Sequence, residues 1–281
     1  MAGSGTQDSP YLVSDVYDFC AINDGETYSG NYFKLTSDID FNDHETYKNG
    51  ISAAIISRDS AILNGDGHKI SNMTFSGTAQ KIKFSSINNV EFVFVTVQAV
   101  TSNSAQIYAP TFNNCNFGFF LSSSNMGCIF GTNGSFIDCK FNLKGTSPQS
   151  WIGKINFNRC HINFVDFTHT DAAIFSSNVG NFVFRNSYIT GTVTANNLDK
   201  ILYSCTLINS FLALKISSTK SYYTVESCEC TATSFIDKEL LQNASFPSLT
   251  YLHYLTTSQC MDNAYLQSIG YPAFPAFPAK E

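Results

Sequence analysis

The stretch Phe112-Asn113-Asn114-Cys115-Asn116-Phe117 decides the fold. Its first and sixth residues are apolar, its fourth is small, and its second and third are polar. The same pattern recurs along the middle of the chain. The other copies occupy residues 70–75, 87–92, 136–141, 157–162, 184–189, 202–207 and 225–230. A pattern that repeats every 17 to 27 residues indicates a solenoid, in which each repeat forms one coil.

Several solenoid architectures share such a period. Leucine-rich repeats need a dense leucine consensus, and helical repeats need long amphipathic stretches. The copies in this chain instead alternate apolar and polar residues with a period of two, which favours short β-strands. We therefore predict an all-β chain that forms one right-handed parallel β-helix of about eight or more coils.

The fourth position of the pattern is predicted to lie inside the β-helix next to a bend, where the interior is narrow and small side chains fit. In a stacked coil, each residue lies over its counterparts in the neighbouring coils. This predicts a buried ladder of Met73, Val90, Cys115, Cys139, Cys160, Ser187, Cys205 and Cys228. A disulfide or a metal site formed by Cys115, Cys139 and Cys160 is the alternative to packing, and packing is the favoured interpretation.

The two ends of the chain depart from the pattern, as the caps of a solenoid must. Residues 1–50 are predicted to form the N-terminal cap, with a strand at 10–13 and a short helix at 15–22 that Ser14 caps. Residues 51–234 are predicted to form the coils.

Residues 235–281 are predicted to form the C-terminal cap. Helical segments are expected at 238–242 and 258–268. The proline-rich tail at 272–278 is expected either to dock on a partner subunit or to be disordered.

Composition limits the possible partners. The net charge of −6 and the lack of a Lys/Arg cluster argue against nucleic acid. The chain begins without the basic start and apolar run of a secretory signal. No apolar stretch reaches the roughly 20 residues that span a bilayer, so membrane insertion is not expected. Nine cysteines, odd in number and widely spread, predict buried thiols in a protein that folds in a reducing cytoplasm.

Catalytic candidates are few among the coils. Asp166 and Asp171 bracket His169, and this trio is the best candidate for a polysaccharide-cleaving site. Residues five apart on a strand point to opposite faces unless a turn intervenes, so a solvated loop is the favoured interpretation. We therefore predict no catalytic residue and keep these three only as weak candidates. The sequence favours a protein that is not an enzyme.

Metal and cofactor sites are not predicted either. An acidic cluster precedes the coils and is interpreted as turn-forming; it consists of Asp38, Asp40, Asp43, His44 and Glu45. Cys228 and Cys230 with His253 lack zinc-ligand spacing. Gly65–Gly67 is interpreted as a turn, since no phosphate-loop lysine and no helix follow it.

Exposed aromatic rings on a β-helix can stack on sugars while neighbouring polar groups hydrogen-bond to the hydroxyl groups. The candidates for such ligand binding are Trp151, Tyr188, Tyr222 and Tyr223. Packing of these rings against a neighbouring subunit is the alternative, and the sequence leaves both open.

Three stretches resemble a known group of proteins. Residues 5–13 with 32–41 resemble the opening of bacterial and phage surface β-helices, and residues 63–75 resemble their first full coil, written as "DGNGHTI-NL". Residues 266–272 resemble their C-terminal ends. The group includes adhesins, pectate-lyase-like enzymes and phage receptor-binding proteins, so the resemblance is specific for fold and not for function.

Within that group we expect a phage virion structural protein, a fibre or tailspike-like appendage for host attachment. Its expected partners are other virion proteins, a bacterial surface polysaccharide and, by analogy with phage β-helices, two further copies in a homotrimer. The expected location is the virion, with the bacterial cell surface as the alternative. A polysaccharide depolymerase (hydrolase or lyase) on the same fold and a bacterial surface adhesin are the rival functions.

Overall fold

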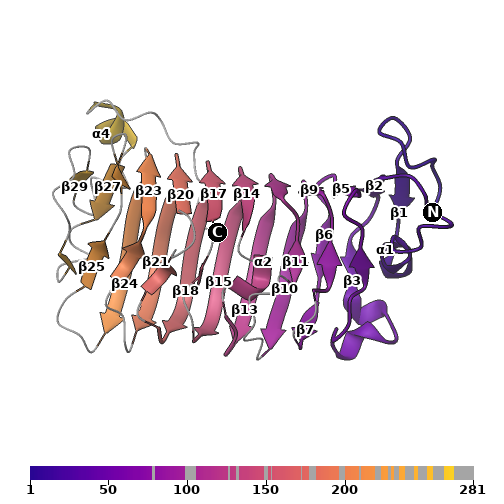
Figure 1. The fold of residues 1–281 in the computed structure, drawn as a ribbon, viewed down its shortest axis with the longest axis horizontal. Helices are drawn as coiled ribbons and strands as arrows, with labels where there is room; N and C mark the ends of the chain where they lie inside the picture. Colours follow the sequence, from indigo (N-terminus) through magenta and orange to yellow (C-terminus); the bar gives the residue numbers. More distant parts are fainter. Residues whose placement is uncertain are drawn as a thin grey trace.

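The computed structural model describes most of the chain. The described residues are 1–77, 80–98, 106–125, 127–130, 133–148, 151–152, 154–171, 173–176, 182–195, 200–208, 210–218, 223–226, 229–230, 234–237, 244–245, 252–255 and 263–268. They form a mostly-β parallel solenoid, so the predicted fold class is confirmed. Figure 1 shows the coils stacked along one long axis, with the N-terminal segment at one end.

One face of the solenoid is a ten-stranded sheet, which we call sheet A. Its strands are β1 (Tyr11–Val13), β2 (Tyr32–Leu35), β5 (Ile62–Asn64), β9 (Ser86–Asn88), β12 (Thr111–Asn113), β14 (Asn133–Ile137), β17 (Lys154–Asn158), β20 (Phe182–Arg185), β23 (Cys205–Ile208) and β26 (Glu229–Cys230). All of its neighbouring strands pair in parallel. The first two strands belong to the predicted N-terminal cap, so the cap continues the sheet of the coils.

A second face is an eleven-stranded sheet, which we call sheet B. Its strands are β3 (Ile39–Asp40), β6 (Lys69–Ser71), β7 (Thr74–Ser76), β10 (Glu91–Gln98), β13 (Asn116–Ser122), β15 (Lys140–Ser147), β18 (His161–His169), β21 (Tyr188–Ala195), β24 (Phe211–Ser218), β27 (Ser234–Asp237) and β29 (Leu252–Leu255).

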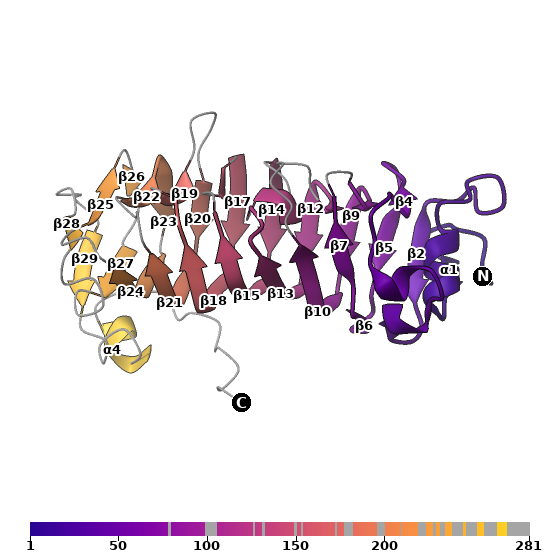
Figure 2. The same ribbon diagram turned by 90° about the horizontal axis from the view of Figure 1, so that it is seen from below.

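Two shorter sheets form the remaining side, visible in Figure 2. One contains β4 (Ile56–Ser57), β8 (Ile82–Lys83) and β11 (Ile107–Tyr108). The other contains β16 (Trp151–Ile152), β19 (Ala173–Ser176), β22 (Lys200–Tyr203), β25 (Tyr223–Glu226) and β28 (Ala244–Ser245). The described helical segments are α1 (Val16–Ala21), η1 (Phe41–Asp43), η2 (Tyr47–Asn49), α2 (Gly127–Phe130) and α4 (Asn263–Ser268). No helix in the described ranges is long and apolar enough to cross a membrane.

Columns of phenylalanine fill the interior. Phe112, Phe136, Phe157 and Phe184 occupy the same position of sheet A in successive coils. Their ring centroids lie 4.8 to 5.3 Å apart, and neighbouring ring planes differ by 5° to 15°. The spacing follows from the separation of parallel strands, which is about 4.8 Å. All four rings are at most 1% exposed. Stacking of the coils therefore shields the inward-facing rings of each coil from solvent.

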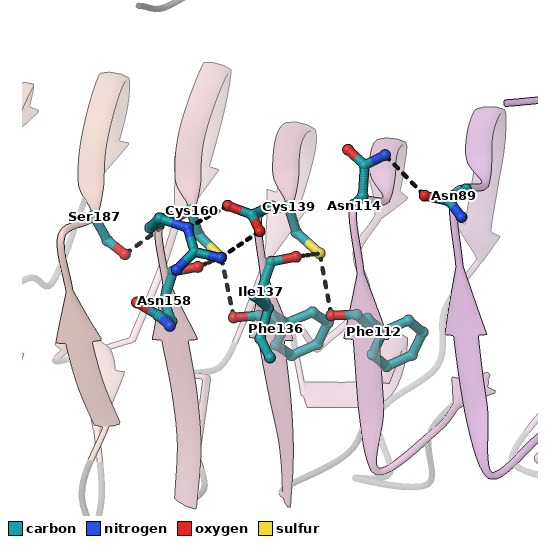
Figure 3. Close-up of polar contacts among 11 residues, drawn as sticks. Asn89, Phe112, Asn114, Phe136, Ile137, Cys139, Asn158, Cys160 and Ser187 are labelled. Atoms are coloured by element: carbon teal, nitrogen blue, oxygen red, sulfur yellow. Dashed lines mark hydrogen bonds and ion pairs between the residues drawn. The ribbon is translucent and has the colours of Figure 1, made fainter. Parts of the chain in front are cut away.

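A second column combines packing with hydrogen bonding. Cys115, Cys139, Cys160, Ser187 and Ser210 occupy the bend between sheets A and B in successive coils. Each side chain contacts a carbonyl of its own coil and one of the preceding coil, as Figure 3 shows for Cys139 and Cys160. The Ser210 hydroxyl makes the same two contacts at 2.9 and 3.0 Å. A small side chain that can donate a hydrogen therefore suits this position.

The structure assigns two of the predicted ladder residues to other columns. Met73 is buried, but its neighbours in sequence pair with β10, so it lies beside Val95 and not below Val90. The reason is the longer turn between β5 and β6, which shifts the repeat of this coil. Cys205 is also buried, but it begins β23 and pairs with Phe182, and Ser210 takes the ladder position. Cys228 lies outside the described residues.

The third position of the repeat adopts a left-handed backbone. The φ values lie between 49° and 56° at Asn89, Asn114, Asp138, Arg159 and Asn186. Asn and Asp tolerate this conformation better than most residues. Each backbone N–H then donates to a carbonyl of the next coil at 2.8 to 3.0 Å. The frequent Asn of the repeat is thus explained by turn geometry.

The N-terminal cap differs slightly from the prediction. Asp15, not Ser14, caps α1, because its side chain accepts a hydrogen bond from the Asp18 N–H. Ser14 instead donates to the Asp18 carboxylate at 2.8 Å. At the other end, α4 forms the last part of the helix expected at 258–268. The segment 238–242 and the proline-rich tail lie outside the described residues.

Replacing Cys139 tests the ladder. We expect Cys139→Ser to change the free energy of unfolding by less than about 1 kcal/mol, because Ser187 and Ser210 make the same carbonyl contacts. Cys139→Leu overfills the narrow bend and is expected to destabilise the fold by about 1–3 kcal/mol. Urea denaturation measures both. A serine variant as unstable as the leucine variant would contradict this account.

Candidate functional site

A groove of about 570 Å³ opens on the outer face of sheet A near the N-terminal cap. Strands β2, β5, β9 and β12 form its floor, and the segment before β1 forms one wall. Its lining residues are Gln7, Pro10, Tyr32, Phe33, Lys34, Ile62, Asn64, Asn88, Asn89 and Asn113. Concave sites of this size are where proteins commonly bind small molecules or segments of a polymer.

The floor of the groove is one column of outward-facing polar residues. Strand pairing places Lys34, Asn64, Asn88 and Asn113 at the same position in four successive coils. They face outward because their neighbours along each strand, such as Phe112, are buried, and side chains alternate between the two faces of a strand. In these four coils the position thus presents one polar side chain per coil, about 4.8 Å from the next, and Ile137 ends the polar column in the following coil.

Hydrogen bonds between coils hold these amides in place. The Asn113 amide donates to the Asn88 side-chain oxygen at 2.7 Å. In the adjacent turn, Asn114 donates to Asn89 at 2.9 Å, as Figure 3 shows. Asn89 in turn donates to Asn64 at 2.9 Å. An amide group has two donor hydrogens and two acceptor lone pairs, so each linked amide keeps further hydrogen-bonding capacity.

The charged groups at the groove are paired locally. Lys34 forms an ion pair with Asp66 at 2.8 Å. The hydrogen bond from Lys34 and its positive charge lower the pKa of the Asp66 carboxyl group. Asp66 lies in the predicted Gly65–Gly67 turn, which the structure contains. The groove is therefore lined largely by neutral amides, with the ion-paired Lys34 at one end of the polar column and the partly exposed Tyr32 beside it.

The acidic cluster of the N-terminal cap is used for local structure. Asp38 accepts hydrogen bonds from the Lys69 N–H and from His68, and these contacts lower its pKa. Asp40 accepts from Asn72, and Glu45 pairs with Lys48. Within the part of the chain that the structure describes, no group of three His, Cys, Asp or Glu residues is arranged to hold a metal ion.

The catalytic candidates on β18 do not share one face. Asp166 is exposed and lies in a β-bulge with a φ of 47°. His169 is 0% exposed and points into the interior. Asp171 follows the strand and is partly exposed. The bulge does not bring Asp166 to the side of His169, so the trio forms no common site on the surface.

His169 is a structural histidine in this arrangement. Its Nε2–H donates to the Ala173 carbonyl at 2.7 Å, while Nδ1 has no hydrogen-bond partner among the described residues. Burial lowers the pKa of His169, although the Ala173 carbonyl and Asp171 act in the opposite direction. A neutral imidazole fits this setting, because only one of its nitrogens needs a hydrogen-bond acceptor.

Trp151 and Tyr188, the two predicted ligand-binding aromatics whose side chains the structure describes, are both buried. Trp151 is 0% exposed, and its ring stacks on Phe175 in the interior at 5.9 Å. Its indole N–H has no partner among the described residues. Tyr188 is 6% exposed and packs edge-on against Phe211 at 5.7 Å. Tyr222 and the Tyr223 side chain lie outside what the structure describes.

Sequence analysis missed the groove. The available signal was the recurrence of Asn at the second position of the repeat, in Asn88 and Asn113. The groove itself requires residues 7–10 to lie beside strands that begin more than 20 residues later, which no local pattern encodes.

Comparisons with known proteins extend only to the fold. No family model matches the chain, and no curated protein matches it. Among solved structures, the chain is similar to a putative immunoglobulin A1 protease from Bacteroides ovatus, with 14% sequence identity and a TM-score of 0.52. The match covers 95% of this chain and 90% of that one. At this identity, the similarity shows a shared β-solenoid fold.

The pH dependence of stability tests the environment of His161 on sheet B. Burial, and to a lesser degree Lys140, lower the pKa of His161 to about 4. Because an unfolded histidine has a pKa near 6.5, the unfolded state binds more protons between pH 6.5 and 4. We therefore expect His161 to destabilise the fold by about 2–3 kcal/mol as the pH falls through this range.

The matched variant is His161→Gln, which keeps a polar group but does not titrate. Urea denaturation at pH 7 and pH 4.5 should show a smaller loss of stability for this variant than for the wild type. Since His169 is present in both proteins, its own contribution cancels in the difference. Equal losses in both proteins would contradict the assigned pKa.

Proposed function

We propose that this protein is an attachment module that binds a bacterial surface polysaccharide along the outer face of sheet A. The observation that supports the proposal most directly is the groove, in which Lys34, Asn64, Asn88 and Asn113 form a column with one polar side chain per coil. A polysaccharide is itself a repeating ligand with hydroxyl groups along its length.

The chemistry of the groove fits sugars. Hydroxyl groups of a sugar both donate and accept hydrogen bonds, as the side-chain amides do. Tyr32 adds an aromatic ring of the kind that stacks on the apolar face of a sugar. The hydrogen bonds of Asn113 to Asn88 and of Asn89 to Asn64 fix the amides before a ligand arrives. Such preorganisation reduces the entropy lost on binding.

The setting that we propose is a phage virion, with the chain as a homotrimeric fibre or tailspike-like appendage attached to other virion proteins. In support, Cys115, Cys139 and Cys160 are buried thiols that form no disulfide, which fits assembly in a reducing cytoplasm. Burial also raises the pKa of Cys139, so its thiol stays protonated. The bacterial cell surface is the alternative location.

Substitutions in the groove test polysaccharide binding. We expect the wild type to bind at least one preparation in a panel of capsular and lipopolysaccharide O-chain polysaccharides, immobilised for biolayer interferometry. The triple variant Tyr32→Ala, Asn88→Ala, Asn113→Ala should lose at least about 1.4 kcal/mol of binding free energy, which is about tenfold in affinity, because it removes an aromatic contact and two amides.

The control for this experiment is Thr194→Ala, an exposed substitution on sheet B. It should bind as the wild type does. If the wild type bound no polysaccharide in the panel, or if the triple variant bound as tightly as the wild type, the groove would not be the binding site.

The oligomeric state tests the proposed trimer. Size-exclusion chromatography with light scattering is expected to give three times the chain mass of 30.9 kDa, with no change between micromolar concentrations and tenfold dilution. A single species of 30.9 kDa would contradict the proposed trimer. It would not bear on polysaccharide binding in the groove, which the triple variant tests separately.

A further inference from the structure

Two lysines stand out on the outer face of sheet B. Lys140 and Lys144 both lie on β15, and neither forms an ion pair with any described residue. Four other lysines pair with a carboxylate at 2.6 to 3.7 Å; these are Lys34, Lys48, Lys69 and Lys83. On β15 and its two neighbours, β13 and β18, the sole carboxylate is Asp166, which lies in the bulge directly after Val165, the partner of Lys144. A protein with a net charge of −6 thus carries a locally positive surface here.

The surroundings of the two lysines are amides and hydroxyls. Strand pairing places Asn142, Asn163 and Thr190 in one outward column, next to the column of Lys140. The Asn163 amide donates to Asn142 at 3.1 Å, and the Thr190 hydroxyl donates to Asn163 at 3.2 Å. His161 and Thr190 are hydrogen-bonded at 2.7 Å. This network fixes the side chains between the lysines.

An exposed aromatic ring borders the same surface. Phe120 of β13 pairs directly with Lys144 and is 45% exposed. Phe94, in a bulge of the adjacent β10, is 74% exposed and has a φ of 53°. A left-handed conformation is unusual for a bulky residue and costs free energy. The fold therefore holds two phenylalanine rings in solvent beside a positive, amide-rich surface.

We infer that this surface, the lysine–amide patch of Phe120, Lys140, Asn142, Lys144, Asn163 and Thr190, binds an acidic saccharide. The lysines bind carboxylates of the sugar units, the amides and the hydroxyl bind sugar hydroxyls, and Phe120 stacks on a ring face. The two lysines are four residues apart on one strand, which is about 13 Å. That separation suits two acidic units of one chain rather than a single anion.

The inference rests on the proposed function in taking the ligand to be a saccharide, but it concerns a different sheet from the groove. An acidic polymer that has no sugar hydroxyl groups, such as an acidic peptide, would contact only the two lysines. The ordered Asn142–Asn163–Thr190 network and the Phe120 ring favour a sugar over an acidic peptide, since these groups match hydroxyls and ring faces.

Three soluble probes test the inference: polygalacturonate, its carboxyl-reduced neutral form, and poly-L-glutamate. Affinity electrophoresis at 50 mM salt is expected to retard the wild type with polygalacturonate alone. The double variant Lys140→Ala, Lys144→Ala should bind at least tenfold more weakly, and Lys140→Arg, Lys144→Arg should retain binding. Retardation should fall as salt rises, because salt screens exposed charges.

The matched control is Lys48→Ala, Lys154→Ala, which removes two exposed lysines outside sheet B. It should bind polygalacturonate within twofold of the wild type, as should the groove variant Asn88→Ala, Asn113→Ala. The second comparison separates the patch from the groove. If the groove variant alone lost polygalacturonate binding, the patch would be wrong while polysaccharide binding by the groove would stand.

Three other results would overturn the inference. Absence of retardation by polygalacturonate would show that the patch binds no uronate polymer. Equal retardation by the neutral form would remove the role of the carboxylates. Equal retardation by poly-L-glutamate would assign the patch to acidic polymers in general. None of these three results would decide whether the groove binds a surface polysaccharide, because the triple variant Tyr32→Ala, Asn88→Ala, Asn113→Ala tests that separately.

Discussion

Parallel strands hydrogen-bond each coil to the coils on both sides, and the register of this pairing fixes where each side chain lies. Where Phe112 is in register with Phe136, and Phe136 with Phe157, three rings stack in the interior. The same pairing places Asn113 over Asn88 on the outside. A shift of one residue would exchange the two faces and expose the phenylalanines. The core and the surface are thus consequences of one register.

The register is reinforced at the bends. Ladder residues such as Cys139 and Ser210 contact carbonyls of two successive coils. At the turns, residues such as Asn114 adopt a left-handed backbone whose N–H bonds to the next coil. The Asp138–Arg159 pair adds two hydrogen bonds at 2.5 and 2.6 Å between neighbouring turns. These contacts join coils at the points where strand pairing stops, so polar groups at the bends stay satisfied.

A stack of this kind can place similar polar side chains in columns on its outer faces. The outward position that carries Lys34, Asn64, Asn88 and Asn113 gives four successive polar side chains on sheet A before Ile137 interrupts the column, and an outward position on sheet B gives Asn142, Asn163 and Thr190. Since strand pairing joins each coil to its neighbours, the pairing itself sets the spacing of these groups. A repeating polymer can therefore contact several coils at once, and weak single contacts add up.

The sequence by itself determined the solenoid, the strands of the repeat and the burial of Cys115, Cys139 and Cys160, because these depend on a local pattern of period two and on its recurrence. It misplaced Met73 and Cys205, because the lengths of the turns before them shift the coil without changing the pattern. Only the tertiary structure decided that Trp151 points inward and that residues 7–10 wall a groove above β2. Those facts depend on contacts between segments far apart in the chain, which a single strand's alternation does not record.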